Sequence, residues 1–245
     1  MTDYEVLIRK KMKHIVSFSG GKDSTAMLLR MIELDMPIDK IVFSDTGLEF
    51  PELYEYIKRV EKYIGKKITI IKPKRNWDDY FYSKVKKGSN KGIIYGFPLM
   101  MGAWCNSRLK MLPLERWFKK QGNHIRYIGI ASDETNRKKN NKNYKYPLMD
   151  WEWTEKKCLI YLKKKGLENP LYKKFKRIGC WLCPKQNKDS LRVLYQDYPE
   201  LWNKLKKYEE DSPVAFKPDF KLKEVEDSWK NQTKLSSQTK GEEDE

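Results

Sequence analysis

Short apolar runs that end in glycine or proline alternate with amphipathic stretches over the first 132 residues, and this alternation constrains the fold most. β-branched and aromatic residues favour strands, and Gly and Pro interrupt them. We expect strands in four runs: HIVSFS (14–19), KIVFSDTG (40–47), KITIIKP (67–73) and HIRYIGIAS (124–132). Apolar residues recur at helical spacing over 23–34, 50–65 and 108–121, so helices follow the first three strands.

Strands that alternate with helices indicate βαβ units, and therefore an α/β fold with a mainly parallel sheet covered by helices on both faces. Further helices are expected at 154–166 and 188–210, and the region 74–104, rich in Gly and aromatics, is interpreted as an insertion or lid. We predict three parts. They are a nucleotide-binding α/β domain (1–153), a small helical C-terminal part (154–229) and a polar, disordered tail (230–245).

The composition excludes several classes of protein. No stretch of 18 consecutive apolar residues occurs, so we expect no membrane span. The N-terminal apolar run is too short for a signal peptide. Four cysteines in 245 residues do not make a disulfide scaffold. We therefore expect a globular cytoplasmic protein.

The net charge of +17 is unevenly placed. Residues 72–91 carry seven basic and two acidic side chains, 137–145 five and none, and 163–177 seven and one. Nearly all of the excess therefore lies in three segments, as on a surface that meets polyphosphate or nucleic acid. Solvated lysine-rich loops are the alternative explanation.

The turn between the first strand and the first helix carries the strongest local signal. Gly20 and Gly21 let the backbone approach a ligand closely. The N–H groups of such a turn, with a helix N-terminus behind them, form a cradle for anions. Lys22 adds a charge, and Ser19 and Ser24 offer hydroxyl groups. The turn is not a Walker A loop, because Asp23 follows the lysine and position 16 is valine.

Seven motifs together resemble the PP-loop ATP pyrophosphatase superfamily, and in particular its phosphoadenosine phosphosulfate (PAPS) reductase branch. They are Ser19–Ser24, Ser44–Gly47 with Glu49–Glu52, Cys105–Lys110 with Pro113-Leu114, Gly129–Glu134 with Arg137, Pro147–Trp151, Asn169–Tyr172 and Gly179–Pro184. The resemblance implies a Rossmann-like fold of the adenine nucleotide alpha hydrolase type. It also implies that Ser19, Gly20, Gly21, Lys22, Asp23 and Ser24 hold the pyrophosphate of ATP or of a related adenine nucleotide, together with Mg²⁺.

The sequence departs from the reductases at three points. It has no cysteine after Cys183, whereas the true sulfonucleotide reductases that it resembles carry a C-terminal cysteine that attacks the sulfate sulfur. Trp104-Cys105 stands where relatives that bind a four-ligand cluster have a cysteine pair, and Ala131 stands where many reductases have arginine. These departures disfavour PAPS reduction and leave nucleotide binding intact.

Cys180 and Cys183 form a C-x-x-C pair, which by itself is compatible with zinc, an iron–sulfur cluster or a redox dithiol. The resemblance places Cys105 near this pair. Three thiolates suit a [4Fe–4S] cluster with one open iron, which is our preferred prediction over zinc or merely structural thiols. Cys158 lies in an amphipathic helical stretch and is interpreted as packing.

Other candidates lie where the expected strands end. Ser44 and Asp45 are predicted to border the adenosine, and Asp45 either faces Mg²⁺ or stabilises its turn. Gly129, Asp133 and Arg137 are predicted to bind the nucleotide, with a surface salt bridge as the alternative for Asp133 and Arg137. Trp77, Tyr80, Phe81 and Tyr82 lie among basic residues, as in stacking platforms for single strands, although core packing is the favoured interpretation for at least two of them.

Three functions remain open from the sequence. The preferred one is an enzyme that adenylates an acceptor with ATP and then transfers sulfur to it. Lys22, Asp23 and Cys105 are its predicted catalytic residues, and nucleic acid, either tRNA or DNA, is its predicted acceptor, with a separate sulfur donor or thiol. The second is reduction of adenylyl sulfate or phosphoadenylyl sulfate by an external thiol. The third is a non-catalytic nucleic-acid-binding protein that senses nucleotides.

Overall fold

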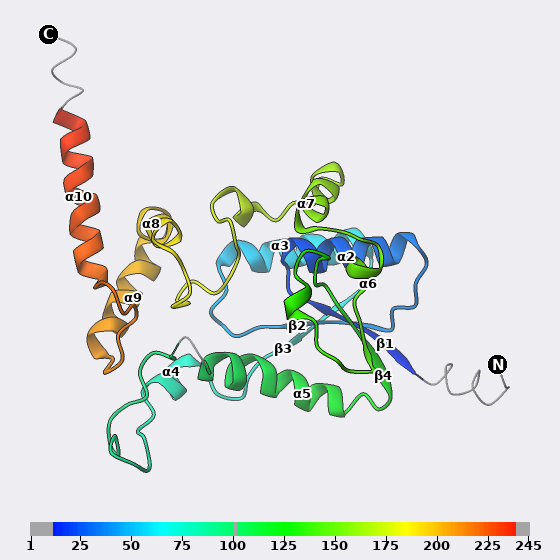
Figure 1. Ribbon diagram of the computed structural model, residues 1–245, viewed down its shortest axis with the longest axis horizontal. Helices are drawn as coiled ribbons and strands as arrows, with labels where there is room; N and C mark the ends of the chain where they lie inside the picture. Colours follow the sequence, from blue (N-terminus) through cyan, green and yellow to red (C-terminus); the bar gives the residue numbers. More distant parts are fainter. Residues whose placement is uncertain (1–11, 100–101, 239–245) are drawn as a thin grey trace, which may run out of the picture. The chain divides into compact units, whose positions relative to one another are not determined.

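The computed structural model describes residues 12–99 and 102–238, and the side chains of 233–238 are not described. Five strands form one sheet. They are β1 (Lys13–Phe18), β2 (Lys40–Ser44), β3 (Ile68–Ile71), β4 (His124–Ile128) and β5 (Tyr144–Lys145). The strand order is β3-β2-β1-β4-β5, and all neighbouring strands are parallel (Figure 1). The expected α/β fold with a parallel sheet is confirmed.

The helices have the following bounds. They are α2 (Lys22–Glu33), α3 (Pro51–Ile64), α4 (Trp77–Phe81), α5 (Leu112–Lys119), α6 (Pro147–Asp150), α7 (Glu155–Lys164), α8 (Lys188–Asp197), α9 (Pro199–Asp211) and α10 (Leu222–Gln238). A π-helix, η1 (Asn106–Met111), leads into α5, and two short 3₁₀-helices are η2 (Thr135–Arg137) and η3 (Pro170–Lys173).

Helices cover both faces of the sheet, as the sequence predicts. Figure 1 shows α2 and α3 on one side of the sheet and α5 on the other. Phe118 of α5 packs against Ile15 of β1 and Val42 of β2, and all three side chains are buried. A strand buried on both faces reads as a continuous apolar run, and the buried Ile41, Val42 and Phe43 of β2 fit that pattern.

The chain divides into two compact units. One consists of residues 1–74 and 106–180 and contains the sheet; the other consists of 75–105 and 181–245. Helix α7 therefore belongs to the unit of the sheet, whereas 75–105 belongs with the C-terminal helices. Where separately folding domains divide, including the predicted boundary after residue 153, stays a prediction.

Aromatic side chains form the core of the second unit. Trp77 and Phe81 are buried, and the ring of Phe81 lies 5.4 Å from that of Phe97 and 4.9 Å from that of Tyr208. Tyr82 remains 41% exposed, and its hydroxyl donates to Asp211. Trp77 and Phe81 thus pack in a core, so their rings are not surface platforms for bases.

Several element boundaries differ from the expectations. The helix expected at 188–210 is two helices, α8 and α9, because Tyr198 leaves helical geometry and Pro199 starts a new helix. The tail expected to be disordered from residue 230 is helical as far as Gln238, where α10 ends. Residues 239–245 lie outside the described residues. Within the described part of the chain, no helix is long and apolar enough to cross a membrane.

Candidate functional site

The loop Ser19–Ser24 joins the carboxyl end of β1 to the first turn of α2. Gly20 has φ +73°, where other residues are strained, and a Cβ there would lie 2.5 Å from Leu53 Cδ1, so the position favours glycine. The Ser24 hydroxyl donates to Gly21 O and accepts from Ser19 N, which closes the turn. Gly21 is the N-cap of α2 and offers no capping side chain. The N-terminal end of α2 therefore keeps the positive partial charge that binds anions.

A segment far along the chain holds this loop in place. Asn169 is fully buried and donates from Nδ2 to Gly20 O over 2.9 Å. Its Oδ1 accepts from Leu171 N, which starts η3. Tyr172 Oη accepts from Lys22 N over 2.9 Å. In the sequence, these residues appear only within the motif Asn169–Tyr172. The asparagine followed by proline, Asn169-Pro170, is the signal that could have indicated a residue supporting the loop.

Lys22, the first residue of α2, lies close to two carboxylates. Its Nζ is 2.9 Å from Glu155 Oε1 of α7 and 3.7 Å from Asp23 Oδ2. Burial opposes the charge on this ammonium, but the hydrogen bond to Glu155 and the charge of Asp23 outweigh it and raise the pKa of Lys22. Lys22 is therefore a cation that is held in place at neutral pH.

Three carboxyl groups meet beside this lysine. One oxygen each of Asp23, Glu134 and Glu155 lies within 4.8 Å of the others, and among the described residues only this trio of potential ligands does so. Asp23 Oδ1 is buried and accepts no hydrogen bond from the described residues. Burial raises the pKa of Asp23 to about 6, Glu155 and Glu134 add to the shift, and Lys22 opposes it.

Hard divalent cations take oxygen ligands, and Mg²⁺ is commonly held by one or two carboxylates together with substrate phosphates. The orphaned, buried Asp23 oxygen and the two neighbouring glutamates fit that donor set. The sequence predicts a role for Asp23 and contains Glu134 within one of the seven motifs, but sequence reasoning did not identify Glu155. Thr154, a good N-cap residue before an apolar helical pattern, places Glu155 in a first helical turn and was the available signal.

Asp133 and Arg137 act on these carboxylates. Asp133 accepts from Glu155 N at 3.1 Å and 3.4 Å through its two oxygens, which orients the start of α7. Arg137 donates to Glu134 Oε2 over 2.6 Å in a half-exposed ion pair. Their predicted direct role in nucleotide binding stays a prediction, and the contacts shown are with α7 and with Glu134.

Gly129 lies where β4 passes the first turn of α2. A Cβ at this position would lie 2.7 Å from Ser24 Cα and 2.8 Å from Ser24 N. Both are backbone atoms, which cannot give way as a side chain can. Gly129 thus lets the chain after β4 pass close to the backbone of Ser24. Its predicted contact with the nucleotide stays a prediction.

The end of β2 carries Ser44 and Asp45. Asp45 Oδ1 accepts from Gly47 N and from Tyr54 Oη, each over 2.8 Å, and Oδ2 lies 3.5 Å from Lys72 Nζ. These contacts are those of a turn-stabilising aspartate, the alternative left open by the sequence. Ser44 is buried, and its hydroxyl has no hydrogen-bond partner among the described residues.

The predicted cluster cysteines are divided between the units. Cys105 and Cys183 belong to the second unit and Cys180 ends the first, and all three are partly buried and outside any disulfide. Their convergence on one cluster stays a prediction. Near Cys183, Lys217 Nζ donates to the carbonyl oxygens of Pro184 and Gln186, a support that the sequence did not indicate.

Cys158 differs from these three cysteines. It is fully buried in α7, and burial together with the charge of Asp23 raises its thiol pKa to about 12. The thiol is therefore protonated at neutral pH, which agrees with a packing role.

The sequence profile of the phosphoadenosine phosphosulfate reductase domain matches residues 13–186. Two uncharacterized proteins of Methanocaldococcus jannaschii are each 31% identical to this chain, over 78% and 95% of its length. A phosphoadenosine 5'-phosphosulfate reductase of Vibrio vulnificus is 27% identical over 65% of the chain. The chain spans only 40% and 57% of the two M. jannaschii proteins and 61% of the reductase.

Solved structures support the fold. The PAPS reductase of Candida auris, in complex with phosphate, has a TM-score of 0.51 at 19% identity and covers 74% of this chain, which covers 89% of that structure. The tRNA thiolase NcsA of Methanococcus maripaludis, solved with its [4Fe–4S] cluster, has a TM-score of 0.44 at 14% identity, with coverage of 81% and 71%. The second score is too low to carry an argument.

Proposed function

Because the chain belongs to the phosphoadenosine phosphosulfate reductase domain family, we propose that it binds ATP or a related adenine nucleotide at Ser19–Ser24. We further propose that it adenylates an acceptor and transfers sulfur to it. The observation that carries the proposal is the arrangement of the α2 N-terminus, whose N-cap residue is glycine, the Lys22 ammonium and the Asp23 carboxylate within one turn. A polyphosphate needs such a set of fixed positive groups, together with a carboxylate that holds its cation.

The reaction balances without an external oxidant. An acceptor oxygen forms a bond to the α-phosphorus of ATP, and the bond from that phosphorus to the bridging oxygen of the β-phosphate breaks, which releases pyrophosphate. A hydrosulfide-level sulfur then attacks the adenylated carbon, and AMP leaves with the former acceptor oxygen. Lys22 and the N–H groups of the loop stabilise the negative charge that develops on the departing pyrophosphate.

The three carboxylates Asp23, Glu134 and Glu155 are the proposed holders of Mg²⁺. A bound Mg²⁺ supplies charge neutralisation at phosphate oxygens. Lys22 already pairs with Glu155, so nucleotide entry exchanges that ion pair for contacts with phosphate. Asp133 keeps Glu155 in reach during the exchange, because it holds the backbone at the start of α7.

The binding step is tested by isothermal titration of Mg·ATP into the native protein and into Lys22→Met. Loss of a charged hydrogen-bonding group costs about 1.5–3 kcal/mol, so we expect ATP affinity to fall about 10-fold to 100-fold. Lys62→Met, an exposed lysine on α3, is the matched control and should bind ATP as the native protein does. Equal affinity in both variants would contradict a phosphate-binding role for the loop.

The metal site is tested separately, by Mn²⁺ titration in the presence of ATP. Glu134→Gln removes one of three carboxylates and should weaken Mn²⁺ binding about 10-fold, on the order of the loss of one charged ligand contact. Glu210→Gln removes an exposed carboxylate of α9 and should have no effect. Unchanged Mn²⁺ affinity in Glu134→Gln would remove this carboxylate from the proposed set.

Cys105, Cys180 and Cys183 are the proposed ligands of a [4Fe–4S] cluster, with zinc and a dithiol as the alternatives. A cluster with three protein ligands supplies an open iron at which sulfur can bind. The test is the iron content and visible spectrum of protein purified without oxygen. Native protein and Cys158→Ser should both be brown, and Cys105→Ser should lose iron. A colourless native protein would remove the cluster from the proposal.

Reduction of PAPS is the second candidate, because the relative in Vibrio vulnificus carries that activity in its name. Ala131, which stands where many reductases have arginine, disfavours it. Sulfite release from PAPS with an external thiol would support this candidate. Formation of AMP and pyrophosphate from ATP with a nucleic-acid acceptor would support sulfur transfer. Tight ATP binding with neither product would point to a nucleotide sensor.

A further inference from the structure

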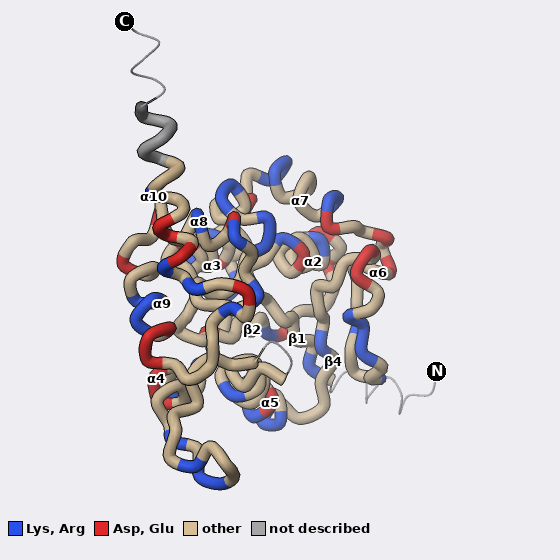
Figure 2. Tube along the Cα trace, turned by 60° about the vertical axis from the view of Figure 1, so that its left-hand side comes forward, with Lys and Arg blue, Asp and Glu red and all other residues tan. Residues whose placement is uncertain are grey.

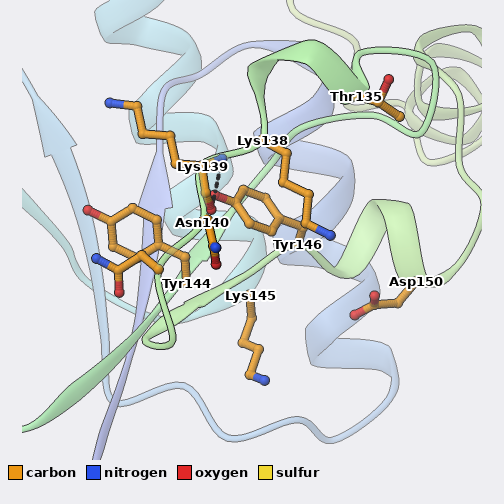
Figure 3. A pocket seen from close by; sticks show the side chains of 9 residues that line it. Thr135, Lys138, Lys139, Asn140, Tyr144, Lys145, Tyr146 and Asp150 are labelled. Carbon is orange, nitrogen blue, oxygen red and sulfur yellow. Dashed lines mark hydrogen bonds between the residues drawn. The ribbon is translucent and has the colours of Figure 1, made fainter.

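A pocket of about 600 Å³ lies in the unit that contains the sheet (Figure 3). Its lining comes mostly from one of the three basic segments, with Thr135 of η2, Tyr146 and the last residue of α6, Asp150. The lining residues are Thr135, Lys138, Lys139, Asn140, Asn141, Tyr144, Lys145, Tyr146 and Asp150. Thr135 directly follows Glu134, and Lys138 follows Arg137, which pairs with Glu134. The pocket is thus linked to the carboxylate cluster through η2, which contributes Thr135 to the lining and has Glu134 as its N-cap.

The wall of the pocket is held by specific hydrogen bonds. Tyr146 is buried, and its hydroxyl accepts from Lys139 N and donates to Lys139 O, each over 3.0 Å (Figure 3). Asn141 Oδ1 accepts from Asn143 N, and Asn141 O accepts from Tyr144 N. The segment between η2 and β5 is therefore a formed loop, and its lysines project from a fixed backbone.

The pocket carries uncompensated positive charge. Lys138, Lys139 and Lys145 are exposed, and within the described parts of the chain no ion pair is recorded for any of them. Arg137, one residue before them, is already paired with Glu134. Asp150 is the acidic residue of the lining, so the pocket has an excess of cations. Figure 2 shows this run of basic residues leading into α6.

The lining also offers groups that suit a base. Tyr144 is half-buried, and the Arg126 guanidinium lies 5.3 Å from the centre of its ring, which fixes one face of the phenol. Asn140 and Asn141 contribute amide groups, which both donate and accept hydrogen bonds. Lysines that bind phosphate beside an aromatic ring are the combination by which proteins bind unpaired nucleotides.

We propose that this pocket binds one unpaired nucleotide of a nucleic-acid chain and so presents the acceptor to the nucleotide site. This proposal rests on the proposed sulfur transfer and names its acceptor class. Lys138, Lys139 and Lys145 contact the phosphates on either side of the nucleotide, and Tyr144 stacks on its base. We expect single strands to bind in preference to duplexes, because a base must leave its pair before it can stack on Tyr144.

The test is fluorescence anisotropy with labelled 12-nucleotide single-stranded RNA and DNA, and with the matching duplexes, between 50 and 300 mM KCl. The triple variant Lys138→Ala/Lys139→Ala/Lys145→Ala is compared with Lys62→Ala/Lys66→Ala/Lys67→Ala. The control removes the same charge from exposed residues of α3 and its connection to β3. ATP affinity is measured on the same samples.

We expect the pocket variant to bind single strands at least 10-fold more weakly. The slope of log K against log salt should fall by about 2, as for three lost phosphate contacts on a single strand. Tyr144→Ala should weaken binding at least about 5-fold, the lower range for one stacked base. The control should stay close to the native protein, and every duplex should bind more weakly than its single strand.

Equal loss in both triple variants would reduce the effect to overall charge and overturn the proposal. Displacement of the oligonucleotide by AMP alone, at concentrations that leave the Ser19–Ser24 loop empty, would reassign the pocket to free nucleotides and also overturn it. If strands bind through the pocket but ATP yields no AMP, the docking surface stands and the proposed sulfur transfer fails. If ATP yields AMP but the pocket variant binds strands normally, the proposed sulfur transfer stands and the docking surface fails.

Discussion

At the scale of single residues, the loop Ser19–Ser24 depends on Gly129, which is partly buried, and on Asn169, which is fully buried. Gly129 and Asn169 support the loop from two sides, Gly129 by its lack of a side chain and Asn169 by two hydrogen bonds. Neither carries a charge or a reactive group. The loop is thus held in shape by residues that are distant from it in sequence, and its function should be sensitive to substitutions at these supporting positions.

Gly129→Ala should displace the first turn of α2, because its Cβ would lie 2.7 Å from Ser24 Cα. Overpacking of this kind costs about 1–3 kcal/mol. We expect a lower urea midpoint and ATP affinity reduced at least 10-fold in a titration. Gly179→Ala is the matched control, since a Cβ there meets no atom within 4 Å. Native ATP affinity in Gly129→Ala would show that the loop tolerates the shift.

Asn169→Ala should leave Gly20 O and Leu171 N without their buried partner. Such losses cost about 1–3 kcal/mol, and the loop should bind ATP several-fold more weakly. Asn187→Ala is the control, because it removes a helix cap from α8 in the other unit. The control should lose about 1 kcal/mol of stability with unchanged ATP affinity. An equal effect of both variants on ATP binding would argue against a specific support.

At the scale of elements, α9 and α10 are joined through one buried carboxylate. Glu226 of α10 accepts from Trp202 Nε1 over 2.8 Å and lies 2.6 Å from Lys206 Nζ of α9 and from Lys230 Nζ. Burial opposes its ionisation, but these three donors together lower the pKa of Glu226 to about 2. The ion pairs therefore favour the folded state, because the carboxylate ionises more readily there than in the unfolded chain.

The pH dependence follows from this lowered pKa. The contribution of Glu226 is fully present above its ordinary pKa of 4.5, and it is lost as the pH falls from there towards about 2. Glu226→Gln should lower the opening free energy of α9 and α10 amides in hydrogen exchange by about 2–3 kcal/mol at pH 7. At pH 3 the difference should shrink. A difference that is the same at both pH values would show that charge is not its cause.

At the scale of the whole molecule, the groups proposed to bind nucleotide all belong to one compact unit. The loop, the three carboxylates, Asn169 and Tyr172 lie within residues 12–74 and 106–180. Cys105 and Cys183, by contrast, belong to the other unit. In the proposed reaction, phosphate chemistry and sulfur chemistry therefore use groups from both units.

Mg·ATP should stabilise the first unit selectively. A ligand at 100 times its Kd stabilises the native state by about 2.7 kcal/mol. Hydrogen exchange with saturating Mg·ATP should therefore slow for amides of β1, α2 and α7, and change little for α8 and α9. ATP with excess EDTA is the control and should protect these amides less. Equal protection of both units would contradict a nucleotide site confined to the first.

The sequence alone determined the α/β class, the position of the loop and the order of the main elements, because these follow from local hydrophobic period and from glycine and proline. It did not resolve the helix end at Tyr198, where the backbone leaves helical geometry before Pro199, or the length of α10. Only the tertiary structure brought Glu155, Asn169 and Tyr172 to the loop, and it showed Asp45 bonded within its own turn. Residues so distant along the chain meet only once the sheet and its helices have packed, because burial, and not local pattern, decides which carboxylates share a site.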